Sequence, residues 1–237
     1  MNAPKMVLFD AGRTLLEYQD IDTLKGVTAL MPYITSNPRG LTVEEIDRYT
    51  NQVFSHFDKS RKQLYEVPEQ TILKLVYDLL ELKFSISLTE VERIIWSSDS
   101  RKLPTKHAEE VLNALYRKHI DTAVISNLDF SGDLLRVTLN ELFPDNHFKY
   151  VIASSDYGIR KPHPYIFQAG IAMSGYQPKD IWYVGDKIPV DVEGSRNAGM
   201  IPVLYQNARN HYDIIPENLM VIRDLRELMN LVNNIEE

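Results

Sequence analysis

Cysteine is absent from this chain of 237 residues. Its absence excludes disulfide bonds, thiolate metal sites and a cysteine nucleophile, and it fits the reducing cytosol. The chain also lacks any run of about 18 apolar residues, the length that a membrane-spanning helix needs. Residues 1–5 are not followed by an apolar signal region. We therefore expect a cytoplasmic protein without a membrane partner.

An excess of positive charge is missing as well. The chain carries 26 basic and 33 acidic residues, a net charge of −7, and its basic residues form no run. Proteins that bind nucleic acid or anionic membranes usually show such an excess, so we expect neither partner. The apolar fraction of 44% and the charged fraction of 25% are ordinary for a globular protein. Internal repeats and low-complexity segments are absent, and no oligomeric state is predicted.

The most informative stretch lies at the start, where an apolar run leads directly into a carboxylate. Met6–Phe9 are followed by Asp10 and then by a turn of small residues, Ala11 and Gly12. Such a run is typical of an interior strand in a parallel sheet, which presents functional groups beyond its carboxyl end. Asp10 is therefore a candidate catalytic acid, although Asp also commonly opens turns after strands.

Residues 18–104, here called the insert, show apolar residues at helical spacing and no convincing strand. A capping box at Thr42 predicts one helix, Pro68 starts a second, and Thr89 opens a third. The apolar stripe of the second helix comprises Ile72, Leu75, Val76, Leu79 and Leu80. We expect a small bundle of three or four helices that follows the first strand directly.

From residue 105 onward the pattern alternates between helix and strand. Strands are predicted at residues 122–126, 150–153, 181–184, 201–204 and 220–222. Helices are expected between them, one of them over residues 189–198, and another closes the chain. This predicts an α/β fold with a doubly wound parallel sheet, formed by residues 1–17 and 105–237. The insert, residues 18–104, would lie over the functional edge of that sheet as a lid.

Several polar side chains follow the predicted strands. Asp10, Ser126 and Asp186 would meet at one edge if their strands are parallel neighbours, and Asp191 lies five residues after Asp186. Carboxylate oxygens without nearby nitrogen or sulfur ligands suit Mg²⁺. A carboxylate such as Asp10 can also serve as a nucleophile when a cation lies close to it.

Other residues near these strand ends could bind a phosphoryl group. Ser126 and Asn127 offer a hydroxyl and backbone amides, and Lys161 offers a positive charge on a long stem. Each residue also has a plainer explanation, because Ser-Asn often forms a turn and a loop lysine is usually solvated. Asp191 would either cap a helix or orient Lys161 and a water ligand of the metal.

Four motifs occur in a fixed order, namely Phe9–Leu15, Val124–Asn127, Arg160–Pro162, and Val184–Asp186 with Asp191. Together they resemble the haloacid dehalogenase-like hydrolase superfamily, and the insert resembles its C1-type helical cap. The resemblance implies Mg²⁺-dependent phosphoryl transfer from a small phosphorylated molecule. Asp10 would attack phosphorus, giving an aspartyl-phosphate that water then hydrolyses.

The resemblance also implies roles for the remaining motif residues. Thr14 and Ser126 would position phosphoryl oxygens, and Lys161 would neutralise charge. Asp10, Asp186 and the backbone carbonyl of Gly12 would hold Mg²⁺, with Asp191 behind them. Asn127 would contact the substrate.

The chain departs from the phosphatases of this family in its first motif. Gly12 stands where they normally have a second Asp, which protonates the leaving alcohol and later activates water. General acid–base catalysis contributes a factor of about 10² to 10⁴, so we expect a slow phosphatase or one limited to good leaving groups. Arg13 stands where they usually have Gly. It cannot act as a base, and it either binds a substrate anion or simply lies at the surface.

Three alternatives remain open. The 2-haloacid dehalogenases also lack the second Asp, but they use no Mg²⁺ and lack the complete metal motif. Phosphonoacetaldehyde hydrolases have a small residue at the Gly12 position and need a cap lysine that forms a Schiff base. The insert offers Lys25, Lys59, Lys62, Lys74 and Lys83, none of which stands out. A phospholigand-binding module with little turnover would not need Asp10 beside a metal site.

Overall fold

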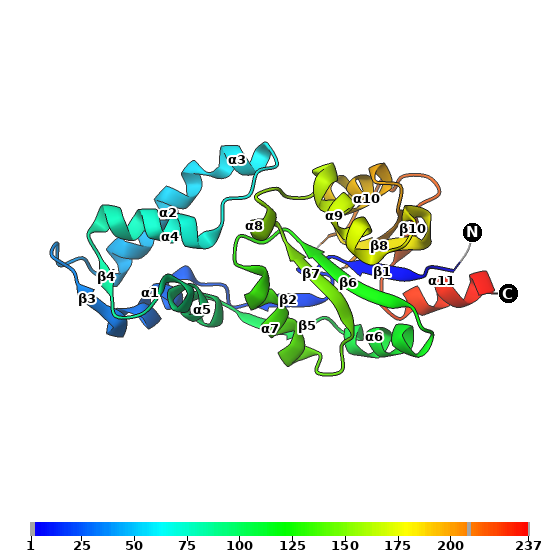
Figure 1. Cartoon of the computed structure of the whole chain (residues 1–237), viewed down its shortest axis with the longest axis horizontal. Helices are drawn as coiled ribbons and strands as arrows, with labels where there is room; N and C mark the ends of the chain where they lie inside the picture. Colours follow the sequence, from blue (N-terminus) through cyan, green and yellow to red (C-terminus); the bar gives the residue numbers. More distant parts are fainter. Residues whose placement is uncertain (1–2, 208–209, 237) are drawn as a thin grey trace.

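The chain folds around a parallel sheet. The computed structural model describes residues 3–207 and 210–236. Within them, six strands pair in the order β10-β9-β8-β1-β6-β7, and every pair is parallel. Their bounds are β1 (Met6–Phe9), β6 (Asp121–Ser126), β7 (Phe148–Ala153), β8 (Ile181–Gly185), β9 (Ile201–Tyr205) and β10 (Met220–Ile222). The six predicted strands are confirmed, and β1 lies between β6 and β8 (Figure 1).

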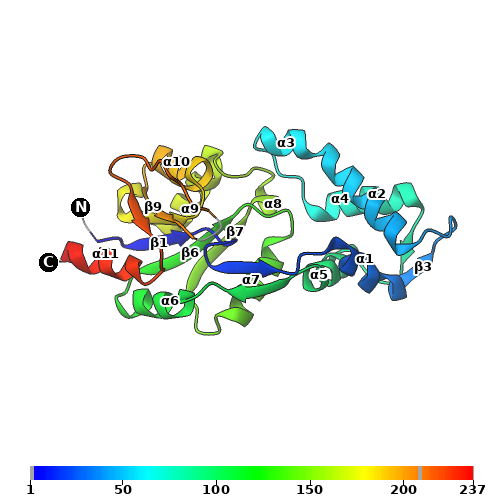
Figure 2. The same ribbon diagram turned by 180° about the vertical axis from the view of Figure 1, so that it is seen from behind.

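Helices cover both faces of this sheet, as a doubly wound fold requires. Val7 and Phe9 of β1 pack in a cluster with α6 (Ala108–Arg117), α7 (Gly132–Leu142) and α11 (Glu227–Glu236). Met6 and Leu8 point to the opposite face, where α9 (Pro164–Ser174) packs. The alternation follows from the two-residue period of a strand. Both termini lie at the same end of the molecule (Figure 2).

Short helical segments complete this part of the chain. They are α8 (Ser154–Tyr157), η2 (Pro178–Asp180), η3 (Ile188–Val192) and α10 (Glu193–Asn197). The prediction of one regular helix over residues 189–198 was wrong in detail, because η3 is a π-helical turn in which the Glu193 N–H donates to the carbonyl of Ile188. Wider turns of this kind often occur at functional sites. None of the described helices is long and apolar enough to cross a membrane.

The insert forms a second hydrophobic cluster from packed helices at the far end of the molecule (Figures 1 and 2). They are α1 (Thr23–Leu30), η1 (Met31–Tyr33), α2 (Val43–His56), α3 (Asp58–Lys62), α4 (Glu69–Leu80) and α5 (Leu88–Ser98). Helices α1 and α4 each contact both α2 and α5, which closes a ring of four helices. The predicted capping box is confirmed, since Thr42 Oγ1 accepts from the Glu45 N–H at 3.3 Å and Glu45 Oε2 from the Thr42 N–H at 2.9 Å.

Two details of the helices in the insert differ from the sequence prediction. Helix α5 begins at Leu88, one residue earlier than expected, because Ser87 caps it by accepting from the Glu90 N–H. On α4, Leu75 and Leu79 are 42% and 49% exposed, and Leu73 and Tyr77 are buried in their place. A stripe of neighbouring apolar residues wider than the contact surface leaves its rim exposed.

The expectation that the insert contains no strand was also wrong. It holds the short antiparallel pair β3 (Ile34–Ser36) and β4 (Lys83–Phe84). A second antiparallel pair, β2 (Leu16–Gln19) with β5 (Arg101–Pro104), joins the insert to the rest of the chain. That remainder, which forms the six-stranded sheet and its helices, is here called the sheet domain. Segments of two to four residues show too little alternation to be recognised from their sequence.

Buried polar contacts attach the insert to the sheet domain. Glu92 of α5 is 1% exposed, and its carboxylate accepts from the backbone N–H of Ser131 at 2.8 Å and from Gln70 Nε2 at 2.7 Å. Ser131 precedes α7, so Glu92 satisfies a free N–H group at the amino terminus of that helix. Trp96 Nε1 donates to the Thr138 hydroxyl at 2.9 Å, which adds a second buried contact between α5 and α7.

Replacing Glu92 by Ala should therefore destabilise the protein. The change leaves the Ser131 N–H and the Gln70 amide without partners, at a cost of roughly 2–4 kcal/mol. Denaturant titration of the free energy of unfolding measures this loss. Glu90→Ala is the control on the same helix, because the Glu90 side chain is solvent-exposed and should change stability by less than about 0.5 kcal/mol. Equal effects of the two substitutions would contradict the role given to Glu92.

Candidate active site

The site lies where β1, β6 and β8 end side by side. Phe9 pairs with Val124 on one side and with Val184 on the other. This register brings the following residues, Asp10, Ser126 and Asp186, to the same edge of the sheet, as the sequence predicted. All three are buried. The Asp10 N–H donates to the carbonyl of Val184 at 2.8 Å, so the first turn after β1 is still held by β8.

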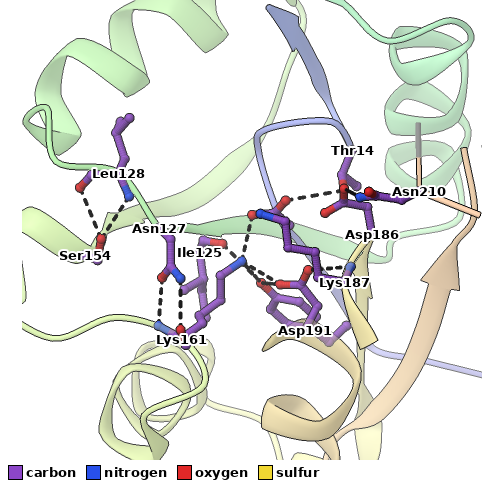
Figure 3. Close-up of polar contacts among 12 residues, drawn as sticks. Thr14, Ile125, Asn127, Leu128, Ser154, Lys161, Asp186, Lys187, Asp191 and Asn210 are labelled. Atoms are coloured by element: carbon purple, nitrogen blue, oxygen red, sulfur yellow. Dashed lines mark hydrogen bonds and ion pairs between the residues drawn. The ribbon is translucent and has the colours of Figure 1, made fainter. Parts of the chain in front are cut away.

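Lys161 occupies the centre of the site. Its side chain is 1% exposed, and its ammonium lies 2.7 Å from Asp10 Oδ1, 2.7 Å from Asp191 Oδ1 and 2.7 Å from the Tyr183 hydroxyl (Figure 3). Burial by itself would lower the pKa of Lys161, but the charges of Asp10 and Asp191 raise it well above its usual range. The ammonium therefore stays charged and fixes both carboxylates.

Asn127 positions Lys161 through the backbone. Its side-chain Oδ1 accepts from the Lys161 N–H at 2.7 Å, and its Nδ2 donates to the Lys161 carbonyl at 2.9 Å (Figure 3). The sequence predicted Asn127 as a substrate ligand. In the structure its amide is occupied by Lys161, while the residue also lines the cavity described below.

Three carboxylates converge at this edge. Asp10, Asp186 and Asp191 each have an oxygen within 4.8 Å of the others. Burial, and then the charges of Asp10 and Asp191, raise the pKa of Asp186 to about 7. Asp186 Oδ2 accepts from Asn210, whereas its buried Oδ1 has no partner among the described residues. A buried oxygen without a donor, next to two further carboxylates, fits a divalent cation that prefers oxygen ligands.

Asp191 approaches this group only because residue 185 is glycine. A Cβ placed on Gly185 would lie 2.5 Å from the Asp191 Cβ and Cγ atoms. Asp191 Oδ2 also accepts from the Lys187 N–H at 3.0 Å, which anchors it in η3. Asp191 thus binds Lys161 as expected, and its oxygen lies close enough to the other two to act as a metal ligand as well.

A cavity of about 240 Å³ opens onto these groups. Its lining includes Asp10, Ser126, Lys161 and Asp191, and also Gly12 and Arg13 of the first turn. Among the described residues, the lysines that line it are Lys161 and Lys187. None of the five insert lysines named above lines it, and neither does Lys102, so the lining offers no cap lysine for the Schiff base of a phosphonoacetaldehyde hydrolase. Thr14 is fully buried, and its hydroxyl lies 3.4 Å from Asp10 Oδ2.

Gly12 and Arg13, the two residues that depart from the family motif, both lie in the first turn after β1. Arg13 has a φ of 65°, in the left-handed region where glycine is favoured, so this Arg takes a conformation that the usual Gly adopts more easily. At Gly12, an added Cβ would lie 3.2 Å from Cε2 and 3.9 Å from the hydroxyl of Tyr18. The Tyr18 ring therefore fills the space beside Gly12 into which an acidic side chain would extend.

Sequence reasoning missed four residues at the site. Tyr183 binds Lys161 and donates to the carbonyl of Ile125 at 3.1 Å, Asn210 binds Asp186, and Tyr18 and Lys187 line the cavity. A tyrosine in a fully buried strand needs a partner for its hydroxyl, and this signal could have identified Tyr183. The other three come from loops or from the insert, whose approach to the site the sequence does not reveal.

Similar sequences occur among known proteins. The family model described as "haloacid dehalogenase-like hydrolase" matches residues 4–199. A glyceraldehyde 3-phosphate phosphatase of Methanopyrus kandleri is 29% identical over 107 residues, which cover 43% of each chain. The matched stretch thus spans less than half the length of that relative.

Solved structures share the fold at lower identity. A haloacid dehalogenase-type phosphatase from Thermococcus onnurineus superposes with a TM-score of 0.61 at 19% identity, covering 98% of both chains. A 2-haloacid dehalogenase from Pseudomonas syringae superposes with a TM-score of 0.66 at 18% identity, covering 99% of both. Because proteins named for two different reactions share this fold, the reaction has to be argued from the site.

Replacing Gly185 by Ala should disrupt the site by displacing Asp191. The added methyl group collides with Asp191 and must displace it from Lys161, at a cost of roughly 1–3 kcal/mol in the free energy of unfolding. Thermal or denaturant unfolding measures this cost. Gly12→Ala is the matched control, since its methyl group meets only the edge of the Tyr18 ring at 3.2 Å. Its cost should stay below about 1 kcal/mol, and a Gly185→Ala protein as stable as the control would contradict the packing described.

Proposed function

The chain belongs to the haloacid dehalogenase-like hydrolases, and we propose that it is a Mg²⁺-dependent phosphatase of small phosphorylated molecules. One observation carries the proposal. The ammonium of Lys161 binds Asp10 and Asp191, yet beside them Asp186 keeps a buried oxygen that has no partner in the part of the chain that the structure describes. One buried ammonium beside three carboxylates leaves a deficit of positive charge, and a divalent cation would supply it and would also attract the anionic phosphate ester.

In this proposal Asp10 is the nucleophile. One oxygen of its carboxylate attacks phosphorus, the bond to the leaving oxygen breaks, and the departing alkoxide takes a proton from solvent. Water then attacks the phosphorus of the aspartyl-phosphate, gives up its proton to solvent, and releases inorganic phosphate and the Asp10 carboxylate. Lys161 orients the Asp10 oxygens and balances charge throughout, while the Thr14 and Ser126 hydroxyls lie beside the phosphoryl group.

The metal site would use Asp10, Asp186 and the backbone carbonyl of Gly12, with Asp191 as a further or indirect ligand. Mg²⁺ bound there would supply positive charge to the phosphoryl oxygens. The residues fit this cation because all of the candidate ligands are oxygens. We propose residues 18–104 as the cap that closes over the substrate.

Dehalogenation is the second candidate. A halide leaves without a proton, so the lack of an acidic side chain at Gly12 would not slow that reaction. The same enzyme would be expected to work without Mg²⁺. The unpartnered oxygen of Asp186 favours the phosphatase, since a site without a metal would leave that oxygen unsatisfied.

Asp10→Asn should abolish the release of phosphate from p-nitrophenyl phosphate and acetyl phosphate. The amide cannot attack phosphorus, so we expect a fall of at least about 10³-fold in kcat with the fold retained. Asp20→Asn is the control, because Asp20 is exposed and lies in the same segment of the chain. Chelation of Mg²⁺ should likewise stop turnover by the unmodified protein. Release of halide from 2-chloropropionate without Mg²⁺ would instead establish the dehalogenase.

Gly12→Asp should restore the missing acid. We expect the rate on alkyl phosphates to rise by up to about 10² to 10⁴-fold, with a smaller gain on p-nitrophenyl phosphate, whose leaving group needs no proton. The Tyr18 ring must shift by a few tenths of an ångström to admit the added Cβ, and it must move further to make room for the carboxylate. Gly12→Asn has the same size without the acid and should give no such gain. Equal rates for the two variants would show that the acid does not limit turnover.

A further inference from the structure

A second cavity, of about 220 Å³, lies within the insert. Helices α1, α2, α4 and α5 contribute to it, and the loop that follows β6 adds Asp129 and Phe130. The apolar side chains that line it are Val27, Phe54, Leu73, Tyr77, Ile95 and Phe130. It is separate from the cavity at Asp10, because the two share no lining residue.

Two carboxylates on the walls of this insert cavity lack a full set of partners among the described residues. Glu69 is 5% exposed, and its carboxylate forms no hydrogen bond or ion pair with any residue in 3–207 or 210–236. Asp47 Oδ2 accepts from the Asn51 amide at 3.0 Å, but its Oδ1 is buried without a partner among the same residues. Buried polar groups in native proteins are nearly always hydrogen-bonded. The buried Asp47 oxygen and the unpaired carboxylate of the largely buried Glu69, on the walls of one cavity, therefore point to a missing donor.

The other charged groups around this cavity are already paired. Asp99 binds Lys102 at 2.8 Å, and Asp129 binds Arg61 at 3.2 Å. The described residues that line the cavity include no lysine, arginine or histidine, so the lining offers no cation to Glu69. Burial, followed by the charges of Asp129, Glu92 and Asp99, raises its pKa well above the usual range.

The geometry of the cavity fits an organic cation as this donor better than a metal ion. Among the described residues, only Asp10, Asp186 and Asp191 bring three acidic ligands within 4.8 Å of one another, so the carboxylates of the insert do not converge as a metal site requires. The apolar and aromatic walls suit the alkyl stem of an organic cation. An ammonium group supplies N–H donors and a positive charge together.

We propose that the insert cavity binds an ammonium group that is carried by the alcohol part of the phosphate ester. The substrate would then be an amine-bearing phosphate monoester, with its phosphate at Asp10 and its ammonium at Glu69 and Asp47. This inference rests on the proposed phosphatase function and adds the class of substrate to it.

The connection between the two cavities supports this assignment. Ser126, Asn127 and Leu128 line the cavity at Asp10, and the next two residues of the same loop, Asp129 and Phe130, line the insert cavity. Side chains also link them. Tyr18, which lines the first cavity, packs edge-on against Trp96 at 6.3 Å between ring centroids, and Trp96 contacts the Phe130 ring at 4.9 Å.

The test compares ω-aminoalkyl phosphates of increasing chain length with alkyl phosphates of equal length. At the length that spans the two cavities, kcat/KM of the unmodified, Mg²⁺-loaded protein should favour the amine by roughly 10- to 100-fold, the factor expected of one charge-assisted hydrogen bond. Glu69→Gln and Asp47→Asn should each reduce this preference. Their kcat on p-nitrophenyl phosphate, which has no ammonium group, should stay unchanged.

Asp78→Asn is the matched control. Asp78 lies on α4 like Glu69, but it is exposed and faces Lys74 rather than the cavity. The control removes the same charge and should keep the full preference for the amine. Because the preference for the amine is a ratio between two substrates, partial loss of folded protein does not alter it.

Alkylammonium ions provide a second readout with the unmodified protein. They should inhibit hydrolysis of the aminoalkyl phosphate competitively and leave that of p-nitrophenyl phosphate nearly unaffected. Noncompetitive inhibition would show that the alkylammonium ion and the substrate bind at the same time. The cavity would then take a separate ligand, and the assignment of the ammonium group to the substrate would be overturned. Equal kcat/KM for the amine and alkyl series at every length would overturn it as well.

The failure of the proposed function can be told apart from the failure of this inference. A protein that hydrolyses p-nitrophenyl phosphate but ignores the amine is a phosphatase without this subsite. If no phosphate ester is hydrolysed, calorimetric titration with an alkylammonium ion still tests the insert cavity. Binding that Glu69→Gln removes and Asp78→Asn keeps would support the ammonium site, and no binding would refute it.

Discussion

The buried ammonium of Lys161 is the interaction on which the rest of the site depends. A charge without solvent is tolerated only when it is paired and hydrogen-bonded, and here Asp10, Asp191 and Tyr183 supply the partners. They come from the end of β1, from η3 and from β8, so the pairing holds three separate segments at one edge of the sheet. Gly185 is the steric condition for it, since any side chain there would displace Asp191.

One ammonium does not balance three carboxylates, and this imbalance gives the site its chemistry. Asp186 keeps a buried oxygen without a partner among the described residues, beside Asp10 and Asp191, which suits a divalent cation and an anionic substrate together. The first turn restricts proton transfer at the site. Gly12 brings no acid, and the ring of Tyr18 occupies the adjacent space, so the leaving group receives no proton from residue 12.

The insert adds a second, distinct electrostatic environment. Its contacts with the sheet domain include buried polar ones. Examples are those of Glu92 and of Glu66, which accepts from the Ser154 hydroxyl at 2.7 Å and from Arg160 at 3.1 Å. Arg160 directly precedes Lys161, so the insert also touches the motif that carries the central ammonium. The cavity lined by Glu69 and Asp47 lies beyond this attachment, where an amine-bearing substrate would be selected.

The sequence by itself determined the parallel sheet, its six strands and the positions of Asp10, Ser126, Lys161, Asp186 and Asp191, because buried strands and the residues that end them follow local rules. It did not determine the two short antiparallel pairs, the exposure of Leu75 and Leu79, or the parts played by Tyr183, Asn210 and Tyr18. Only the tertiary structure decided these, since each depends on contacts between segments far apart in the chain. The occupation of the Asn127 amide by Lys161, and the two carboxylates of the insert that find no full set of partners among the described residues, became visible only once such contacts were known.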